Sequence, residues 1–473
     1  MATARSKPVP AGIGPRLPAQ GSRRPARPGA RMTEPPASIA AAAAMLARGE
    51  TTARALLDQA LERLNRDGDR FHAMRALNPC AAQDAEAADL ARSQGTATGP
   101  LHGIPLVLKD NIDLAGMPTT SGCRALAGAM PRRSAIIVER LRDAGAVIVG
   151  KTNLSEFSFE IRSRSSLGGD VLHPRAPHAS AGGSSGGTAV AVAQGYALGG
   201  IGTDTGGSIR IPAAFNGLVG FRPAHGALPM QGIAPLAPST DTVGPIARTV
   251  ADAELLLAAM GHGVSVSALP RRIGVVREVF GANAAVDAVC ATALDRLAEA
   301  GVTLVDLPAL PADLNPGHGE HIVDAEFATA FDAYLASNFL PGSAPASLDV
   351  IVAGEAFLPD HAKALAARIA AKDRETASIL ARHQALAGHL GAACAALAID
   401  ALVYPTSQAI PDDLENPKGG WAPELAARSG WPALTVCAGF AANGMPVGIE
   451  FLAPPVNEGA LFALARLIEA TAV

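Results

Sequence analysis

The sequence predicts an α/β fold in which a mixed central β-sheet is covered on both faces by helices. Two observations carry this prediction. Strand-like and helix-like segments alternate through residues 104–204, and a strand–helix–strand pattern occupies 272–308. A chain of 473 residues with 49% hydrophobic residues can also bury a large core. We therefore expect residues 33–473 to form a single domain, with a helix-rich variable region over 265–400.

The N-terminal half begins with helical patterns. Residues 37–65 read as two helices separated at Gly49-Glu50, and Thr51-Thr52 provides caps for the second. Another helix is predicted over 82–94 and ends near Gly95. Strand and helix patterns then alternate in five segments: 104–109, 135–145, 146–151, 188–197 and 198–204.

The C-terminal half continues this alternation. A helix is predicted over 249–260, and residues 272–278, 285–301 and 302–308 predict a strand, a helix and a strand. Alanine-rich segments between 320 and 399 have apolar residues spaced by three and four, which is typical of packed helices. The remaining segments predict three strands and a final helix: 401–406, 431–440, 444–454 and 459–470.

The first 32 residues differ from the rest. They contain seven Lys/Arg and no Asp/Glu, are rich in proline and show no apolar periodicity, so we expect a disordered extension. The alternative interpretation is translation that starts at Met32. No apolar segment follows Arg23-Arg24, and no run of 18 apolar, uncharged residues occurs, so we expect a cytoplasmic protein without a membrane span. The acidic remainder does not favour nucleic-acid binding.

Cysteine usage indicates free thiols. The five cysteines are odd in number and scattered, without ligand-like spacing to one another or to histidine. We expect neither a disulfide framework nor a metal site. The five positions are Cys80, Cys123, Cys290, Cys394 and Cys437.

One lysine and two glycine-rich serine loops carry the chemical signal. Ser184 lies in AGGSSGGT, and Ser208 lies in GTDTGGSIRIP. A serine becomes nucleophilic when a base takes its proton, and an uncharged lysine can serve if burial lowers its pKa. Lys109 ends an apolar run, IPLVLK, which favours such burial.

Two other motif matches favour different chemistry. GGSSG at 182–186 fits the nucleophile elbow, but that elbow follows a strand, and 173–181 contains two prolines and predicts none. GAVIVGKT at 145–152 fits the Walker A pattern, but a P-loop needs loop where Val147–Val149 predicts a strand. We therefore reject both interpretations.

The motifs instead resemble the amidase signature family. The signature core covers 100–250, with Lys109 and Ser184 separated by 75 residues and Ser184 and Ser208 by 24. The resemblance implies an α/β amidase signature fold and hydrolysis of amides without a cofactor. Supporting segments are 100–111, 116–122, 150–157, 239–249, 431–440 and 444–454.

The resemblance also assigns roles to residues. Ser208 resembles the nucleophile, Ser184 the serine that follows a cis peptide bond and relays the proton, and Lys109 the base. Asp204 and Arg210 fit either support of this triad or a buried structural pair. The further assignments are an oxyanion hole at Thr205, Gly206, Gly207 and Ser208, triad support from Ser185, Asp204 and Arg210, and a substrate pocket at Ser121, Gly122, Gly183, Trp421 and Trp431.

We therefore expect an enzyme that hydrolyses a linear aryl- or alkyl-amide to a carboxylic acid and an amine or ammonia, acting as a monomer or homodimer on a small molecule. Hydrolysis of esters or carbamates (urethanase activity) and the catalytic subunit of a glutamine-dependent tRNA amidotransferase are the alternatives. The chain departs from the family pattern at His173-Pro174 and at 428–431, which leaves substrate preference open.

Overall fold

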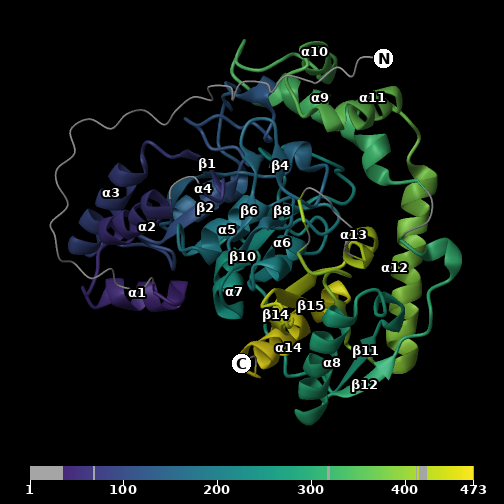
Figure 1. The fold of residues 1–473 in the computed structure, drawn as a ribbon. Helices are drawn as coiled ribbons and strands as arrows, with labels where there is room; N and C mark the ends of the chain where they lie inside the picture. The colour runs from purple at the N-terminus through teal and green to yellow at the C-terminus, as the bar shows by residue number, and fades with distance from the viewer. Residues whose placement is uncertain (1–35, 68–69, 317–319, 412, 415–422, 472–473) are drawn as a thin grey trace, which may run out of the picture. The chain divides into compact units, whose positions relative to one another are not determined.

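The computed structural model of the chain describes residues 36–67, 70–316, 320–411, 413–414 and 423–471 (Figure 1). All of them belong to one compact unit. The predictions made for the segment 1–32 and for Trp421 concern residues outside these described ranges.

A mixed sheet of 11 strands forms the centre of the described part of the chain (Figure 1). In spatial order its strands are β1 (Met74–Leu77), β3 (Val147–Thr152), β2 (Pro105–Lys109), β8 (Gly199–Asp204), β10 (Thr242–Ala247), β9 (Val219–Arg222), β14 (Ala433–Phe440), β15 (Pro446–Leu452), β13 (Ala401–Pro405), β11 (Arg272–Val275) and β12 (Thr303–Asp306). Strand β2 is parallel to both β3 and β8, and β11 is parallel to both β12 and β13. The other neighbours are antiparallel.

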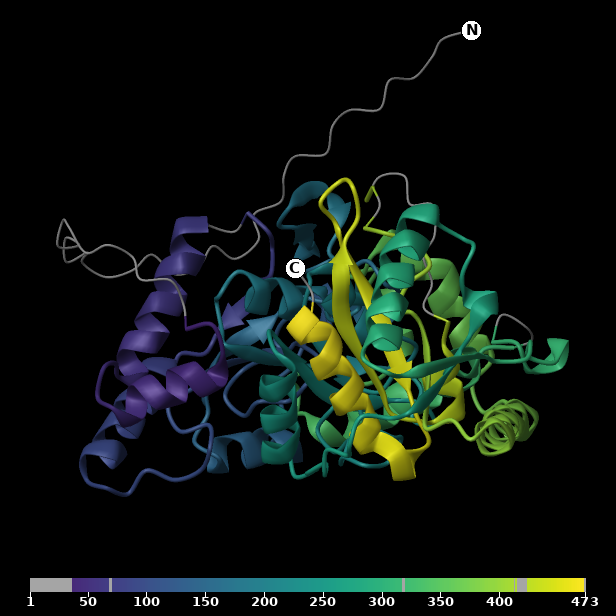
Figure 2. The ribbon, with the colours of Figure 1, turned by 90° about the horizontal axis from the view of Figure 1, so that it is seen from below.

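Helices cover both faces of this sheet because side chains along each strand alternate between two apolar layers. In β2, Leu106 and Leu108 enter one cluster and Val107 enters the other. The first cluster contains side chains of α1 (Ile39–Ala47), α4 (Ile136–Asp143), α7 (Val250–Ala259), α8 (Ala284–Glu299) and α14 (Glu458–Thr471). The second contains side chains of α2 (Ala53–Asp67), α3 (Ala81–Ser93), α5 (Gly186–Ala193) and α6 (Arg210–Phe215). Figure 2 shows α14, in yellow, beside the C-terminal strands.

The alanine-rich segments between 320 and 399 form four helices, which a short fifth follows (Figure 1). These are α9 (Ile322–Asn338), α10 (Leu348–Ala353), α11 (Ala362–Ala370), α12 (Ala377–Leu397) and α13 (Leu425–Ser429). Helices α9, α10 and α11 pack in a cluster of their own that includes Phe157 from the loop after β3. Six short 3-10 helices complete the described elements: η1 (Arg124–Leu126), η2 (Glu156–Ser158), η3 (Arg277–Val279), η4 (Ala312–Leu314), η5 (Pro359–His361) and η6 (Pro455–Asn457).

The predicted fold class is confirmed, and most predicted elements agree with the structure to within a few residues. Thr52 caps α2, since its Oγ1 accepts a hydrogen bond from the Ala55 N–H at 3.0 Å. Residues 147–152 form strand β3, so the segment that matches the Walker A pattern is not the loop that a P-loop needs. Among the described residues, no helix is long and apolar enough to cross a membrane.

The prediction that 173–181 contains no strand is wrong. Strands β6 (Leu172–His173) and β7 (Ala176–Ser180) form a two-stranded sheet apart from the central one, and β4 (Arg164–Ser165) pairs with β5 (Gly169–Asp170). Proline is tolerated in such a strand because an edge position needs no hydrogen bond from its nitrogen. The strand before Ser184 therefore belongs to this separate hairpin and not to the central sheet.

His173 has a structural explanation in this hairpin. Its Nδ1 accepts a hydrogen bond from the Arg175 N–H at 3.1 Å, and its Nε2 lies 2.8 Å from the Phe215 carbonyl oxygen. Burial lowers the pKa of His173, which favours the neutral ring that this pattern requires. The ring therefore closes the turn from His173 to Arg175.

Candidate active site

Lys109 lies at the carboxyl end of β2, between two parallel strands, and its side chain is fully buried. Its Nζ lies 2.6 Å from Ser184 Oγ and 2.8 Å from Thr203 Oγ1. Burial lowers the pKa of Lys109 from 10.5 to about 7, although the negative charges of Asp204 and Asp241 act in the opposite direction. Near neutral pH a large fraction of this amine is therefore uncharged and has a lone pair beside the Ser184 hydroxyl.

Ser184 lies in the loop that leads into α5. The Gly183–Ser184 peptide bond is cis, as the family resemblance implies. The Ser184 carbonyl oxygen accepts hydrogen bonds from the Ser155 N–H at 3.1 Å and from Ser163 Oγ at 3.2 Å. A Cβ at position 183 would come within 2.8 Å of Arg162 N, so only glycine fits this close approach.

Ser208 lies in the loop between β8 and α6, and the two serine loops are joined by a hydrogen bond. The Ser185 N–H donates to the Ser208 carbonyl oxygen at 3.1 Å. Ser185 Oγ also donates to the Thr203 carbonyl oxygen at 3.3 Å. The structure therefore brings Lys109, Ser184 and the Ser208 loop together from three separate segments.

The Asp204 carboxylate fixes the loop 205–208 through two hydrogen bonds to backbone N–H groups. Its Oδ1 accepts a hydrogen bond from the Gly207 N–H at 2.9 Å, and its Oδ2 accepts one from the Ile209 N–H at 3.1 Å. Gly207 has φ +129°, a conformation that disfavours any residue with a Cβ. Within the described residues, the N–H groups of Thr205, Gly206 and Ser208 have no protein acceptor and remain available to a ligand.

Asp204 also belongs to a buried ionic network. Arg210 Nε donates to its Oδ2 at 3.1 Å, and Arg222 Nη1 donates to its Oδ1 at 2.9 Å. Arg210 Nη1 pairs with Glu450, which also accepts a hydrogen bond from the Tyr404 hydroxyl at 2.7 Å. Burial alone would raise the pKa of Asp204, but the two guanidinium groups hold it below its usual value. Asp204 therefore remains ionised while it positions the loop.

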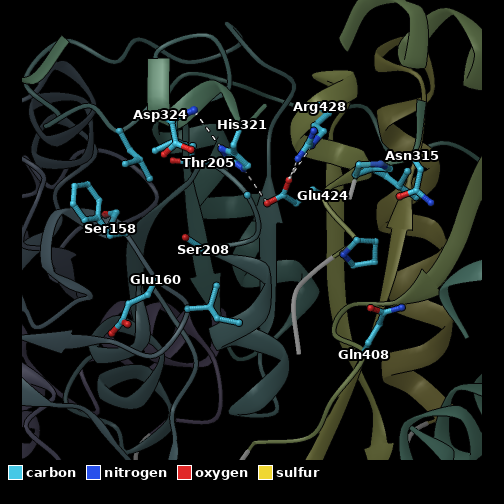
Figure 3. Close-up of a pocket in the computed structure, with 18 of the residues that line it drawn as sticks. Ser158, Glu160, Thr205, Ser208, Asn315, His321, Asp324, Gln408, Glu424 and Arg428 are labelled. Carbon is cyan, nitrogen blue, oxygen red and sulfur yellow. Dashed lines mark hydrogen bonds and ion pairs between the residues drawn. The ribbon is translucent and has the colours of Figure 1, made fainter. Parts of the chain in front are cut away.

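A cavity of about 600 Å³ opens at Ser208 (Figure 3). Thr205, Gly206 and Ser208 form part of its wall beside the segment 158–161. The wall also contains apolar residues of the C-terminal half, including Val279 and Leu310. The other polar and charged residues of the wall are Ser158, Glu160, Glu278, Asn315, His321, Asp324, Arg368, Gln408, Glu424 and Arg428.

Four of the five residues predicted for the substrate pocket do not line this cavity. Ser121, Gly122, Gly183 and Trp431 are absent from the residues that line this cavity. Trp431 is 7% exposed and packs in an apolar cluster with Leu386 and Leu390 of α12, so its ring belongs to the core. Trp421 lies outside the described residues.

Sequence reasoning missed several residues around the predicted triad. Asn111 Nδ2 donates to Thr203 Oγ1 at 2.9 Å, which places both residues next to the lysine. Arg222 and Glu450 are charged residues within strands that are otherwise apolar, and this isolated charge is a signal that could have found them. Glu424 was also missed, because its i,i+4 spacing to Arg428 is a common helical ion-pair pattern and its other partner, His321, lies 103 residues away.

Comparisons with known proteins agree with this geometry. The Amidase family model matches residues 55–462. Among solved structures, the native peptide amidase from Stenotrophomonas maltophilia is 34% identical with a TM-score of 0.80, covering 92% of this chain and 96% of that one. An amidase family protein from Bacillus anthracis is 27% identical with a TM-score of 0.81, covering 92% of this chain and 90% of that one.

Among curated proteins, the chain is similar to a Glutamyl-tRNA(Gln) amidotransferase subunit of Deinococcus radiodurans. The two are 33% identical over 475 residues, which cover 90% of this chain and 96% of the relative.

Proposed function

Because the chain belongs to the amidase signature family, we propose that it hydrolyses a linear amide to a carboxylic acid and an amine or ammonia through an acyl-enzyme on Ser208. The observation that carries this proposal is the 2.6 Å separation between the buried Lys109 Nζ and Ser184 Oγ. The serine loop that bears this hydroxyl is hydrogen-bonded to the Ser208 loop, which lines the cavity.

Acylation begins when Ser208 Oγ attacks the amide carbonyl carbon. The Ser208 proton moves to Ser184 Oγ while the Ser184 proton moves to the uncharged Lys109 Nζ. The N–H groups of Thr205, Gly206 and Ser208 are the donors proposed to stabilise the oxyanion, since the Gly207 N–H already binds Asp204. Lys109 then returns its proton through Ser184 to the nitrogen of the leaving amine, and the C–N bond breaks.

Deacylation uses the same groups with water as the nucleophile. Water loses a proton toward Ser184 and Lys109 as it attacks the ester carbonyl carbon. The proton returns to Ser208 Oγ when the C–O bond of the acyl-enzyme breaks and the carboxylic acid leaves. Lys109 begins and ends the cycle uncharged, so a pKa near 7 suits both directions of transfer.

The experiment that tests this function combines labelling with turnover. The purified chain is treated with a fluorophosphonate probe, and the labelled peptide is identified by mass spectrometry. Aryl, alkyl and peptide C-terminal amides are then offered together with matched esters and carbamates. We expect the label on Ser208 and the release of acid and amine from at least one amide class. A label on another residue, or turnover of esters and carbamates alone, would contradict the proposal.

A second candidate function is the catalytic subunit of a glutamine-dependent tRNA amidotransferase. The 33% identity over 90% of the chain to the Deinococcus radiodurans protein favours it. This function requires partner subunits that receive ammonia from glutamine. Glutaminase activity that appears only with co-purified partners would support it, whereas turnover of simple amides by the isolated chain favours the free-standing hydrolase.

A further inference from the structure

The Glu424 carboxylate lies in the cavity wall beside the loop that bears Ser208. It is the residue just before α13, and Figure 3 shows it between His321 and Arg428 with Ser208 nearby. A Cβ at Gly206 would lie 3.0 Å from Glu424 Oε1, so this oxygen is in direct contact with the loop. Glycine at 206 therefore leaves room for the carboxylate.

Arg428 and His321 fix the orientation of this carboxylate. Arg428, one helical turn along the chain, donates from Nε at 2.9 Å and reaches Glu424 Oε2 from Nη2 at 2.8 Å. His321 Nε2 lies 3.3 Å from Glu424 Oε1. Burial would raise the pKa of Glu424, but His321 and Arg428 lower it below its usual value. The side chain is thus held as an anion, with Oε2 occupied by arginine and Oε1 toward the loop.

The cationic groups of the cavity wall are already used by protein carboxylates. Arg428 is paired with Glu424, and Arg368 is paired with Asp324 at 2.9 Å and lies over the Phe159 ring. Glu278 lines the same cavity and has no cationic partner among the described residues. The wall therefore offers carboxylate oxygens to a ligand and no unpaired guanidinium group.

We propose that Glu424 Oε1 binds a protonated amine carried by the substrate next to the scissile carbonyl, so that the enzyme selects cationic amides of the α-amino amide type. The inference rests on the proposed function, because the position of the carbonyl is that of a substrate on Ser208. A charge-assisted hydrogen bond to Glu424 would orient such an amide, while an amide bearing a carboxylate at the same place meets only like charge. The apolar part of the wall accommodates the remainder of the acyl group.

Three amides of nearly equal size test this selectivity. They are phenylalaninamide, 2-methyl-3-phenylpropanamide and 2-benzylmalonamic acid, which carry an ammonium, a methyl and a carboxylate group on the same carbon. We expect kcat/KM at pH 7 to be at least tenfold higher for the ammonium than for the methyl compound, and lowest for the carboxylate. Equal values for the ammonium and methyl compounds would overturn the proposal and leave the proposed function intact.

The variant Glu424→Gln separates binding from a structural role. It keeps the shape of the side chain and removes its charge, so the kcat/KM ratio of the ammonium to the methyl compound should fall below threefold. Glu299→Gln, which removes one exposed carboxylate on α8, should keep the wild-type ratio. An equal loss for both compounds in Glu424→Gln would show that Glu424 only supports the fold.

Failure of the proposed function gives a different result. In that case no amide is hydrolysed and the fluorophosphonate does not label Ser208. If Ser208 is labelled but none of the three compounds is hydrolysed, the α-amino amide class is wrong and the hydrolase proposal stands.

Discussion

The Lys109 amine and the Ser184 hydroxyl lie 2.6 Å apart in the interior, although 75 residues separate them in the chain. Their proximity results from the packing of α5, which begins just after Ser184, against β2 and its parallel neighbour β8. Lys109 ends β2, and the neighbouring parallel strand β8 ends at Asp204, next to Thr203. The carboxyl ends of parallel strands meet at one edge of the sheet, which is where ligands bind in α/β folds.

The activity should depend on pH through Lys109. The pKa of Lys109 is lowered to about 7, and only the uncharged amine accepts a proton, so kcat/KM should fall tenfold per pH unit well below pH 7 and reach a plateau above it. The measurement is the pH–rate profile for an uncharged amide. Lys109→Met should abolish the activity. A flat profile between pH 5 and 8 would contradict a lysine base.

The same lysine should reduce the stability of the fold. Its folded pKa of about 7 lies below the unfolded value of 10.5, so the unfolded chain binds the proton more tightly. The wild-type free energy of unfolding should therefore increase as pH rises from 7 to 10.5. Below pH 7, Lys109→Met should be more stable than the wild type by up to a few kcal/mol. This is the order of free energy that corresponds to a pKa shift of this size. Urea unfolding of both proteins at pH 6 and pH 10 measures this difference. If the variant were more stable than the wild type by the same free energy at both pH values, the account would be contradicted.

The two serines should respond differently to alanine substitution. Ser208→Ala removes the nucleophile, so both turnover and fluorophosphonate labelling should disappear, with kcat reduced by at least about 10³-fold. Ser184→Ala removes the relay but leaves the nucleophile, so slow labelling of Ser208 should remain. Circular dichroism checks that both variants fold. Equal labelling rates in Ser184→Ala and the wild type would exclude Ser184 from proton transfer.

Thr203 and Asn111 should hold the lysine in position. Thr203 Oγ1 lies 2.8 Å from Lys109 Nζ and accepts a hydrogen bond from Asn111 Nδ2. Thr203→Val removes an acceptor that favours the protonated amine, so the pKa of Lys109 should fall further and the acidic limb of the pH–rate profile should move to lower pH. We expect kcat to fall about tenfold to a hundredfold, within the range of a general-base contribution. Thr203→Ser keeps the hydroxyl and should retain the wild-type profile.

The sequence predicted the alternation of strands and helices because periodicity reports burial directly. It also predicted, through the resemblance to the amidase signature family, the lysine and the serine that lie 2.6 Å apart, Lys109 and Ser184. It did not predict strand β7, because the prolines of this segment disfavour a strand. Pro177 lies in an edge strand, where the missing N–H costs no hydrogen bond of the sheet. Trp431 was assigned to a pocket although its ring is buried, since large aromatic side chains suit both places.

Contacts between side chains of elements far apart in the chain could not be predicted from the sequence. Arg210 was expected to pair with Asp204, and it does, but its second partner Glu450 lies 240 residues away. Glu424 and His321 likewise meet only because α13 and the start of α9 line one cavity. Such contacts depend on the packing of whole elements rather than on local spacing.

Arg222 should be essential for both stability and catalysis. Its Nη1 donates to Asp204 Oδ1 at 2.9 Å, its Nη2 donates to the Thr240 carbonyl oxygen at 2.7 Å, and its side chain is fully buried. Arg222→Met removes a buried cation that donates to both acceptors, so the free energy of unfolding should fall by about 3–5 kcal/mol. Because Asp204 holds the Gly207 N–H, kcat should also fall at temperatures where the variant is folded. Urea unfolding and steady-state kinetics at low temperature measure the two effects. Arg48→Met, which removes an exposed pair with Glu50, is the control and should change neither quantity. An Arg222→Met protein with wild-type stability would show that the buried network does not hold the Ser208 loop.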